Sequence, residues 1–173
     1  MSASPALVSV FLAGRTINDR DLEPAELAEL AAGLADHPEL WQPLVRFDAA
    51  ERVFVRLHRD DHLDAWLICW VASQETGLHD HDESSGAVTL VEGRLTEDRL
   101  VLGGGVDTVE YTAGQGFRFD ASRIHDVRHA GDTPAVSLHL YSPPLLRMGF
   151  YEVGEDGWLA RRSASYLEEL PAS

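Results

Sequence analysis

Two histidines separated by one residue, His79 and His81, are the side chains of this sequence best suited to chemistry. Alternate side chains of an extended strand point to the same face, so a His-x-His pair there can hold one ion from one side. A third histidine, His125, lies far downstream and can complete the set from another strand. Neutral imidazole suits zinc, copper, iron and nickel. The spacing therefore predicts a metal site made of three histidines.

The turns around these histidines resemble the pattern of the cupin superfamily. Gly93 follows the His-x-His pair in a turn, and the turn 112–116 precedes His125. The resemblance implies a mainly β fold, a cupin jelly-roll β-barrel with short N-terminal helices. Many cupins place a carboxylate ligand at the position of Gly86, which has no side chain. Three neutral imidazoles would leave the metal its full positive charge, which favours an anionic ligand such as a thiolate.

The stretch Pro134–Pro144, with the sequence PAVSLHLYSPP, resembles the cysteine dioxygenase family. Together with Glu92–Glu97 and His125, it extends the resemblance from about Phe54 to Pro144. The resemblance implies Fe(II) held by the three histidines, and a hydrogen-bonded relay beside the iron formed by Ser137, His139 and Tyr141. These three residues alternate along one strand, so they project to one face. The resemblance also implies a cis bond between Ser142 and Pro143.

This chain departs from the family pattern at one position and matches it at another. Mammalian members crosslink the strand tyrosine to a cysteine, and Gly86 occupies that position here, so Tyr141 stays an ordinary phenol, as in bacterial members. An arginine of the family grips the substrate carboxylate, and Arg56 matches it, because a planar guanidinium recognises carboxylates with two hydrogen bonds. Arg59 is the competing candidate, since the following loop is shorter than usual.

The reaction that the resemblance implies is the dioxygenation of a small thiol, L-cysteine, by O2 to cysteine sulfinate, in cysteine catabolism. Tyr141 would also contact the bound substrate. The nearest alternative is a dioxygenase of 3-mercaptopropionate or another small thiol, and a non-catalytic metal-binding cupin is a further one. The arginine and the Ser-Pro-Pro sequence favour cysteine over 3-mercaptopropionate, and the relay favours an enzyme over a binding module.

Composition excludes several other functions. A net charge of -15 argues against nucleic acids and anionic membrane surfaces as partners, and all 14 basic residues are arginine, which excludes Schiff-base and P-loop lysines. Cys69 is the only cysteine, so no internal disulfide forms. The sequence shows no signal peptide and no apolar run of spanning length. We expect a cytoplasmic monomer.

The elements that must position the site follow from periodicity. Residues 1–173 are expected to form a single cupin domain, with a helical part at about 1–50, the barrel at about 52–145 and an extension at 146–173. Helical spacing predicts helices at Leu22–Ala35 and Pro38–Leu44. Alternation and glycine turns predict strands from Arg52 onward. Asp80 should point away from the metal, and His37, His58 and His62 should be solvated.

Overall fold

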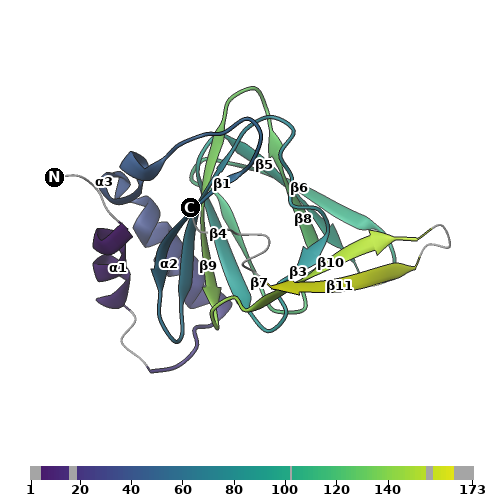
Figure 1. The fold of residues 1–173 in the computed structure, drawn as a ribbon, viewed down its shortest axis with the longest axis horizontal. Helices are drawn as coiled ribbons and strands as arrows, with labels where there is room; N and C mark the ends of the chain where they lie inside the picture. Colours follow the sequence, from purple (N-terminus) through teal and green to yellow (C-terminus); the bar gives the residue numbers. More distant parts are fainter. Residues whose placement is uncertain (1–4, 16–18, 102, 155–157, 166–173) are drawn as a thin grey trace.

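The fold consists of two antiparallel β-sheets with helices on one side (Figure 1). The computed structural model describes residues 5–15, 19–101, 103–154 and 158–165. The first sheet has the order β1 (Val53–Arg59), β2 (Asp64–Trp70), β9 (Ala135–Ser142), β4 (Ser85–Glu92) and β7 (Gly116–Phe119). The second has the order β11 (Leu159–Ser165), β10 (Arg147–Val153), β3 (His79–Asp80), β8 (His125–Ala130), β5 (Arg94–Leu100) and β6 (Val106–Thr112). The mainly β, jelly-roll-like fold that the sequence predicts is confirmed.

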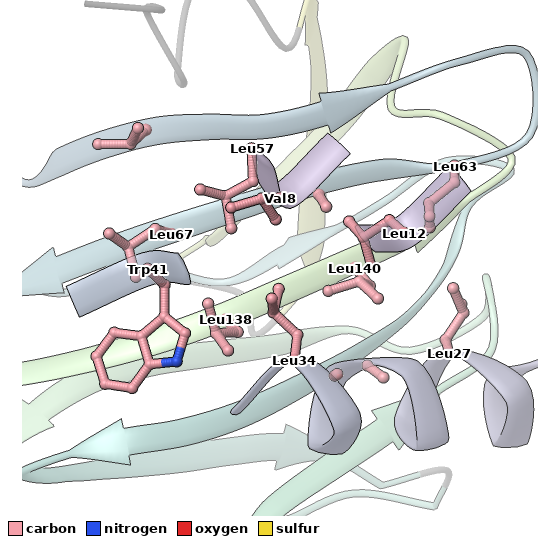
Figure 2. Packing of buried hydrophobic residues seen from close by; sticks show 14 of the residues in the cluster. Val8, Leu12, Leu27, Leu34, Trp41, Leu57, Leu63, Leu67, Leu138 and Leu140 are labelled. Carbon is pink, nitrogen blue, oxygen red and sulfur yellow. The ribbon is translucent and has the colours of Figure 1, made fainter. Parts of the chain in front are cut away.

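The N-terminal helices cover the outer face of the first sheet. They are α1 (Pro5–Ala13), α2 (Pro24–Ala35) and α3 (Pro38–Trp41), followed by a 3-10 turn at Gln42–Leu44. Helix α1 packs on β1, and α2 packs on β4, β9 and β7. Figure 2 shows the resulting core, in which Leu27 and Leu34 of α2 meet Leu138 and Leu140 of β9. The two predicted helices are present, and α1 is an addition to them.

Strands β2 and β9 are buried along their whole length, because each is covered on both faces. Their helix-facing positions, such as Leu67 and Leu138, belong to the core under the helices. Their other positions, such as Trp66 and Trp70, face the space between the sheets. Since side chains alternate along a strand, the polar residues of β9 share this inner face. The fold therefore places polar side chains inside an apolar shell.

The described part of the expected C-terminal extension is a hairpin. Strand β10 pairs with both β11 and β3, so the hairpin continues the second sheet beside the His-x-His strand (Figure 1). The Ser142–Pro143 peptide bond before it is cis, as expected from the resemblance. Gly93 joins β4 to β5 with a φ of 76°, and a Cβ there would lie 2.7 Å from the Ala135 Cα. Across the described ranges, no helix is long and apolar enough to span a membrane.

Candidate metal centre

The structure brings the three candidate histidine ligands together between the sheets. His79 lies on β3 directly opposite His125 on β8, and His81 follows β3 immediately. One ring nitrogen of each lies within 4.8 Å of the others, and all three side chains are buried. Residue alternation thus places His79 and His81 on one side and Asp80 on the other. This cluster could hold a metal ion.

Hydrogen bonds fix two of the three imidazoles. The Nδ1 of His79 donates to the Gly77 carbonyl at 2.9 Å, and the Nδ1 of His125 lies 2.8 Å from a Glu97 carboxylate oxygen. Among the described residues, the buried His125 Nε2 and His81 Nδ1 have no hydrogen-bond partner. Burial lowers the pKa of all three imidazoles below the ordinary value. Neutral rings with unpaired buried nitrogens fit a metal ion, because a ligating imidazole must be unprotonated.

Asp80, between two of the candidate ligands, anchors their strand to the C-terminal hairpin. Its carboxylate accepts hydrogen bonds from Arg161, at 2.8 and 2.9 Å, and from the Tyr151 hydroxyl and the Gly149 amide. Burial raises the pKa of Asp80, but the hydrogen bonds from Arg161 and Tyr151 outweigh this and hold it below the usual range. Asp80 therefore points away from the candidate metal centre and holds β3 in place.

Phe119 fills the space that the missing side chain of Gly86 leaves. The Phe119 ring stacks on His81 with centroids 4.6 Å apart and lies 5.0 Å from His125. A Cβ on Gly86 would lie 2.8 Å from Phe119 Cε2 and closer still to Cζ. Gly86 also pairs with Tyr141 across the β4–β9 ladder. Packing by Phe119 thus leaves no room for a side chain at position 86.

We expect Gly86→Ala to destabilise the protein, because the added methyl group overlaps the buried Phe119 ring. Overpacking of a filled core typically costs about 1–3 kcal/mol of the free energy of unfolding. Denaturant unfolding followed by circular dichroism measures this cost. Gly33→Ala in α2 is the matched control: a Cβ there meets nothing within 4 Å, so the same change should raise stability by about 0.5–1 kcal/mol. Equal effects of the two substitutions would contradict the packing account.

The three relay residues form a continuous hydrogen-bonded chain on the inner face of β9. Ser137 Oγ lies 2.8 Å from His139 Nε2, and His139 Nδ1 lies 3.2 Å from the Tyr141 hydroxyl. The indole of Trp70 donates to Ser137 Oγ at 2.8 Å. An indole only donates, so Ser137 Oγ accepts this hydrogen bond. With its proton on Nδ1, His139 would accept from Ser137 and donate to the tyrosine oxygen, which would leave the Tyr141 proton for a partner in the cavity.

The histidine cluster and two relay residues, His139 and Tyr141, line the same small cavity, of about 30 Å³. Its other walls are mainly aromatic and apolar, with Phe54, Trp70, Phe119, Met148 and Phe150 among them. A wider hollow of about 540 Å³ also reaches His81, and Pro143 and Pro144 line it. The cis-proline turn and His81 thus border the same hollow.

One arginine, Arg52, lines the inner cavity. Its guanidinium carbon lies 5.2 Å from the ring centroids of both Phe54 and Trp70. Its charge also contributes, after burial, to lowering the pKa of His139 to about 3. Arg52 is therefore close enough to the relay to act on a ligand held there.

Arg56 and Arg59, the arginines expected at the substrate, are not among the residues that line the inner cavity. Arg56 lies over the Trp66 ring at 4.6 Å, with its Nε 3.8 Å from Asp64. Arg59 binds Asp64 and the Leu145 carbonyl, and it lines the wider hollow. Both side chains thus share the buried carboxylate of Asp64.

The expectation of solvated histidines is wrong for His58. This ring is 6% exposed and lies between Ser9 Oγ, at 2.7 Å, and Asp60, at 2.9 Å. The physical reason is α1, which covers β1 and supplies Ser9. His37 and His62 are accessible and pair with neighbouring acidic residues, as their polar surroundings suggest. His129 contacts the Thr133 carbonyl, outside the candidate metal centre.

Three residues at the site were not singled out from the sequence: Arg52, Glu97 and Phe119. Arg52 lies just before β1, two residues from Phe54, and Glu97 alternates with Leu95 on β5, so each is two residues from an inward apolar side chain. A charged residue in phase with a buried face is a usable signal of a polar site. Phe119 carries no such signal, because its contact with Gly86 depends on the β4–β7 register.

The fold defines the class of protein, a jelly-roll of the cupin type, and its histidine cluster could hold a metal ion. A Klebsiella pneumoniae protein with a double-stranded β-helix domain has a similar structure, with a TM-score of 0.50 and 15% identity, covering 68% of this chain and 89% of that one. A Thermus thermophilus structure is also similar, with a TM-score of 0.53 and 18% identity, covering 59% of this chain and 92% of that one. At these identities the likeness supports the fold alone.

The sequence identifies the family within this fold class. The family model described as cysteine dioxygenase type I matches residues 3–153, and the chain belongs to that family. The Danio rerio protein named cysteine dioxygenase type 1 is 27% identical over 132 residues, which are 69% of this chain. The match spans 65% of the length of that relative. The family expected from the sequence is thereby confirmed.

Proposed function

We propose that this protein is an Fe(II)-dependent dioxygenase that converts L-cysteine to cysteine sulfinate. The observation that carries the proposal is one small cavity lined by the histidine cluster, by His139 and Tyr141 of the relay, and by an arginine. Ser137 extends the relay from His139. Membership of the cysteine dioxygenase type I family supports the reaction class. The reaction balances without a further reductant, because a thiol R–SH and O2 together give the sulfinic acid R–SO2H.

His79, His81 and His125 are proposed to hold the iron. When bound, the iron supplies the redox chemistry that joins O2 to sulfur. The protein's contribution is binding and orientation: neutral imidazoles leave the positive charge of the metal uncompensated, which favours a thiolate. The apolar walls exclude bulk water and strengthen electrostatic contacts inside the cavity. Tyr141 donates a hydrogen bond to the bound reactants, and His139 and Ser137 hold its oxygen in place.

We infer that Arg52 holds the substrate carboxylate, and we keep Arg56 as the alternative. Arg52 lines the cavity, whereas Arg56 stacks on Trp66 beside the buried Asp64. The Arg52 guanidinium carbon lies 5.2 Å from the ring centroids of Phe54 and Trp70. A planar guanidinium recognises a carboxylate with two hydrogen bonds. The Arg56–Asp64 contact supports a structural role for Arg56.

Arg52→Ala should raise the KM for L-cysteine by about ten-fold or more, because a charge-assisted hydrogen bond typically contributes about 1.5–3 kcal/mol. Cysteamine, which lacks the carboxylate, should be a poor substrate of the parent and should respond little to the substitution. Arg56→Ala, four residues further along the chain, is the matched comparison. Steady-state oxygen uptake by iron-loaded proteins measures the KM of the parent and of both variants, with L-cysteine and with cysteamine. A larger KM effect in Arg56→Ala would assign the carboxylate to Arg56 instead.

The second candidate substrate is 3-mercaptopropionate. No carboxylate belongs to the described lining of the inner cavity, so an amino group of the substrate has no acidic side chain to pair with there. A thiol that lacks the amino group therefore loses no ion pair. Oxygen uptake with both thiols under identical conditions separates the candidates: higher kcat/KM with L-cysteine supports the proposal, and higher kcat/KM with 3-mercaptopropionate replaces it.

We further propose a monomer that acts in the cytoplasm. Cys69 is buried and unpaired, which suits a reducing compartment. Size-exclusion chromatography with light scattering tests the monomer directly. A stable dimer at low micromolar protein concentration would overturn this part of the proposal.

A further inference from the structure

Glu97 is a fully buried carboxylate that contacts one of the candidate iron ligands, His125. It lies on β5 with 0% exposure, and its neighbour two residues on, Arg99, pairs with His125 across the β5–β8 ladder. Residues two apart on a strand share a face, so Glu97 and His125 project into the same layer. The carboxylate oxygen Oε1 lies 2.8 Å from His125 Nδ1. The proposed reaction assigns no role to this carboxylate.

The remaining contacts hold the Glu97 carboxylate in one orientation. Arg123 donates to Oε1 at 3.1 Å, and the Tyr111 hydroxyl donates to Oε2 at 3.1 Å. Arg99 Nε lies 3.7 Å from Oε2. A buried carboxylate with several donors and two nearby guanidinium groups is charge-compensated, so it can accept a hydrogen bond from an imidazole without leaving an unpaired buried charge.

The three candidate ligands differ in the hydrogen-bond partner of their Nδ1 atom. His79 donates to a neutral backbone carbonyl, and His81 Nδ1 has no partner among the described residues. Of these three, only His125 has a carboxylate within hydrogen-bond distance of its Nδ1. A carboxylate that accepts from Nδ1–H fixes the tautomer, turns the Nε2 lone pair toward the metal and makes the ligand more basic. Gly86 offers no carboxylate to bind the metal directly. The Glu97 carboxylate instead contacts one of the candidate ligands, His125.

We propose that Glu97 is the positioning residue of the metal centre, which fixes His125 as the Nδ1–H tautomer and so sets the affinity for iron. The inference rests on the proposed function, because it takes the three histidines as the ligands. Glu97 itself does not touch the metal or the substrate. Its effect is expected in metal binding rather than in the affinity for cysteine.

The test measures the Kd of Fe(II) alone, without oxygen, by competition with a chelator. Glu97→Gln keeps the shape of the side chain and removes its charge, and loss of such a partner typically weakens metal binding about 10–100-fold. Glu110→Gln is the matched control, an exposed carboxylate on the adjacent strand β6 that pairs with Arg94. Its Kd should equal that of the parent. The same Kd in Glu97→Gln and the parent overturns the inference and leaves the proposed function standing.

A measurement on the parent protein decides the question even if Glu97→Gln fails to fold. The ¹⁵N spectrum of the metal-free protein, with His125 assigned by comparison with His125→Asn, reports which ring nitrogen carries the proton. A protonated Nδ1 and an unprotonated Nε2 support the inference, and the opposite tautomer overturns it. If Glu97 acted only in folding, it would not determine which ring nitrogen of His125 carries the proton. A parent that binds no Fe(II) overturns the proposed function and this inference with it.

Discussion

Replacing His81 by alanine should abolish stoichiometric iron binding and reduce oxygen uptake with L-cysteine by about 10³-fold or more, since a catalytic metal contributes several kcal/mol to the barrier. His81 follows β3 and shares the ligand cluster with His79 and His125, so two ligands remain in the variant. Two imidazoles hold a divalent ion far more weakly than three. Elemental analysis after desalting, together with oxygen uptake, measures both effects.

His129→Ala is the matched control for that experiment. His129 lies on β8 like His125, but its ring contacts the Thr133 carbonyl instead of the cluster. Its iron content and activity should therefore match those of the parent. Full iron and full activity in His81→Ala would show that the cluster is not the metal centre.

Replacing Tyr141 by phenylalanine should reduce kcat by about 10²-fold, the usual loss when one aimed hydrogen-bond donor is removed from an active site. The variant keeps the ring and its packing near His81 and Phe119, so folding and iron content should not change. Ser137→Ala removes the far end of the relay but keeps the phenol, so its loss of kcat should be smaller. Steady-state kinetics on iron-loaded proteins ranks the two. An unchanged kcat in Tyr141→Phe would exclude the relay from the reaction.

The pH dependence of the same rate constant tests the electrostatics of the relay. Burial, followed by the charges of Arg52 and His79, lowers the pKa of His139 to about 3. The imidazole is therefore neutral at every pH above that value, and its orientation of Tyr141 should not change near pH 6.5. Burial also raises the pKa of Tyr141, so the phenol keeps its proton well above neutral pH. The kcat of the parent should show no step attributable to His139 near neutrality.

Local alternation was sufficient to place the residues that share one strand. The His-x-His pair and the three relay residues project inward because strand side chains alternate, and this holds whatever the neighbouring strands are. The family resemblance supplied the cupin fold and the cis bond at Ser142–Pro143, both of which the structure contains. These features depend on short segments, which is why the sequence reveals them.

Features that depend on pairing between distant strands were not visible in the sequence. Arg52 directly precedes β1 and Arg56 lies on it, and the sequence alone does not show which of them reaches the cavity. The presence of Asp64 on β2 draws Arg56 and Arg59 toward one end of the strand. Glu97 reaches His125 only through the β5–β8 register, and His58 is buried only because α1 covers it.

The most direct test of the proposed function is the isotopic composition of the product formed by iron-loaded protein from L-cysteine under ¹⁸O2. We expect cysteine sulfinate in which both sulfinate oxygen atoms carry the label, with one O2 consumed for each molecule formed. The metal-free protein should form none. A product without two labelled oxygen atoms, or oxidation that ends at the disulfide cystine, would contradict the assignment of this chain as a cysteine dioxygenase.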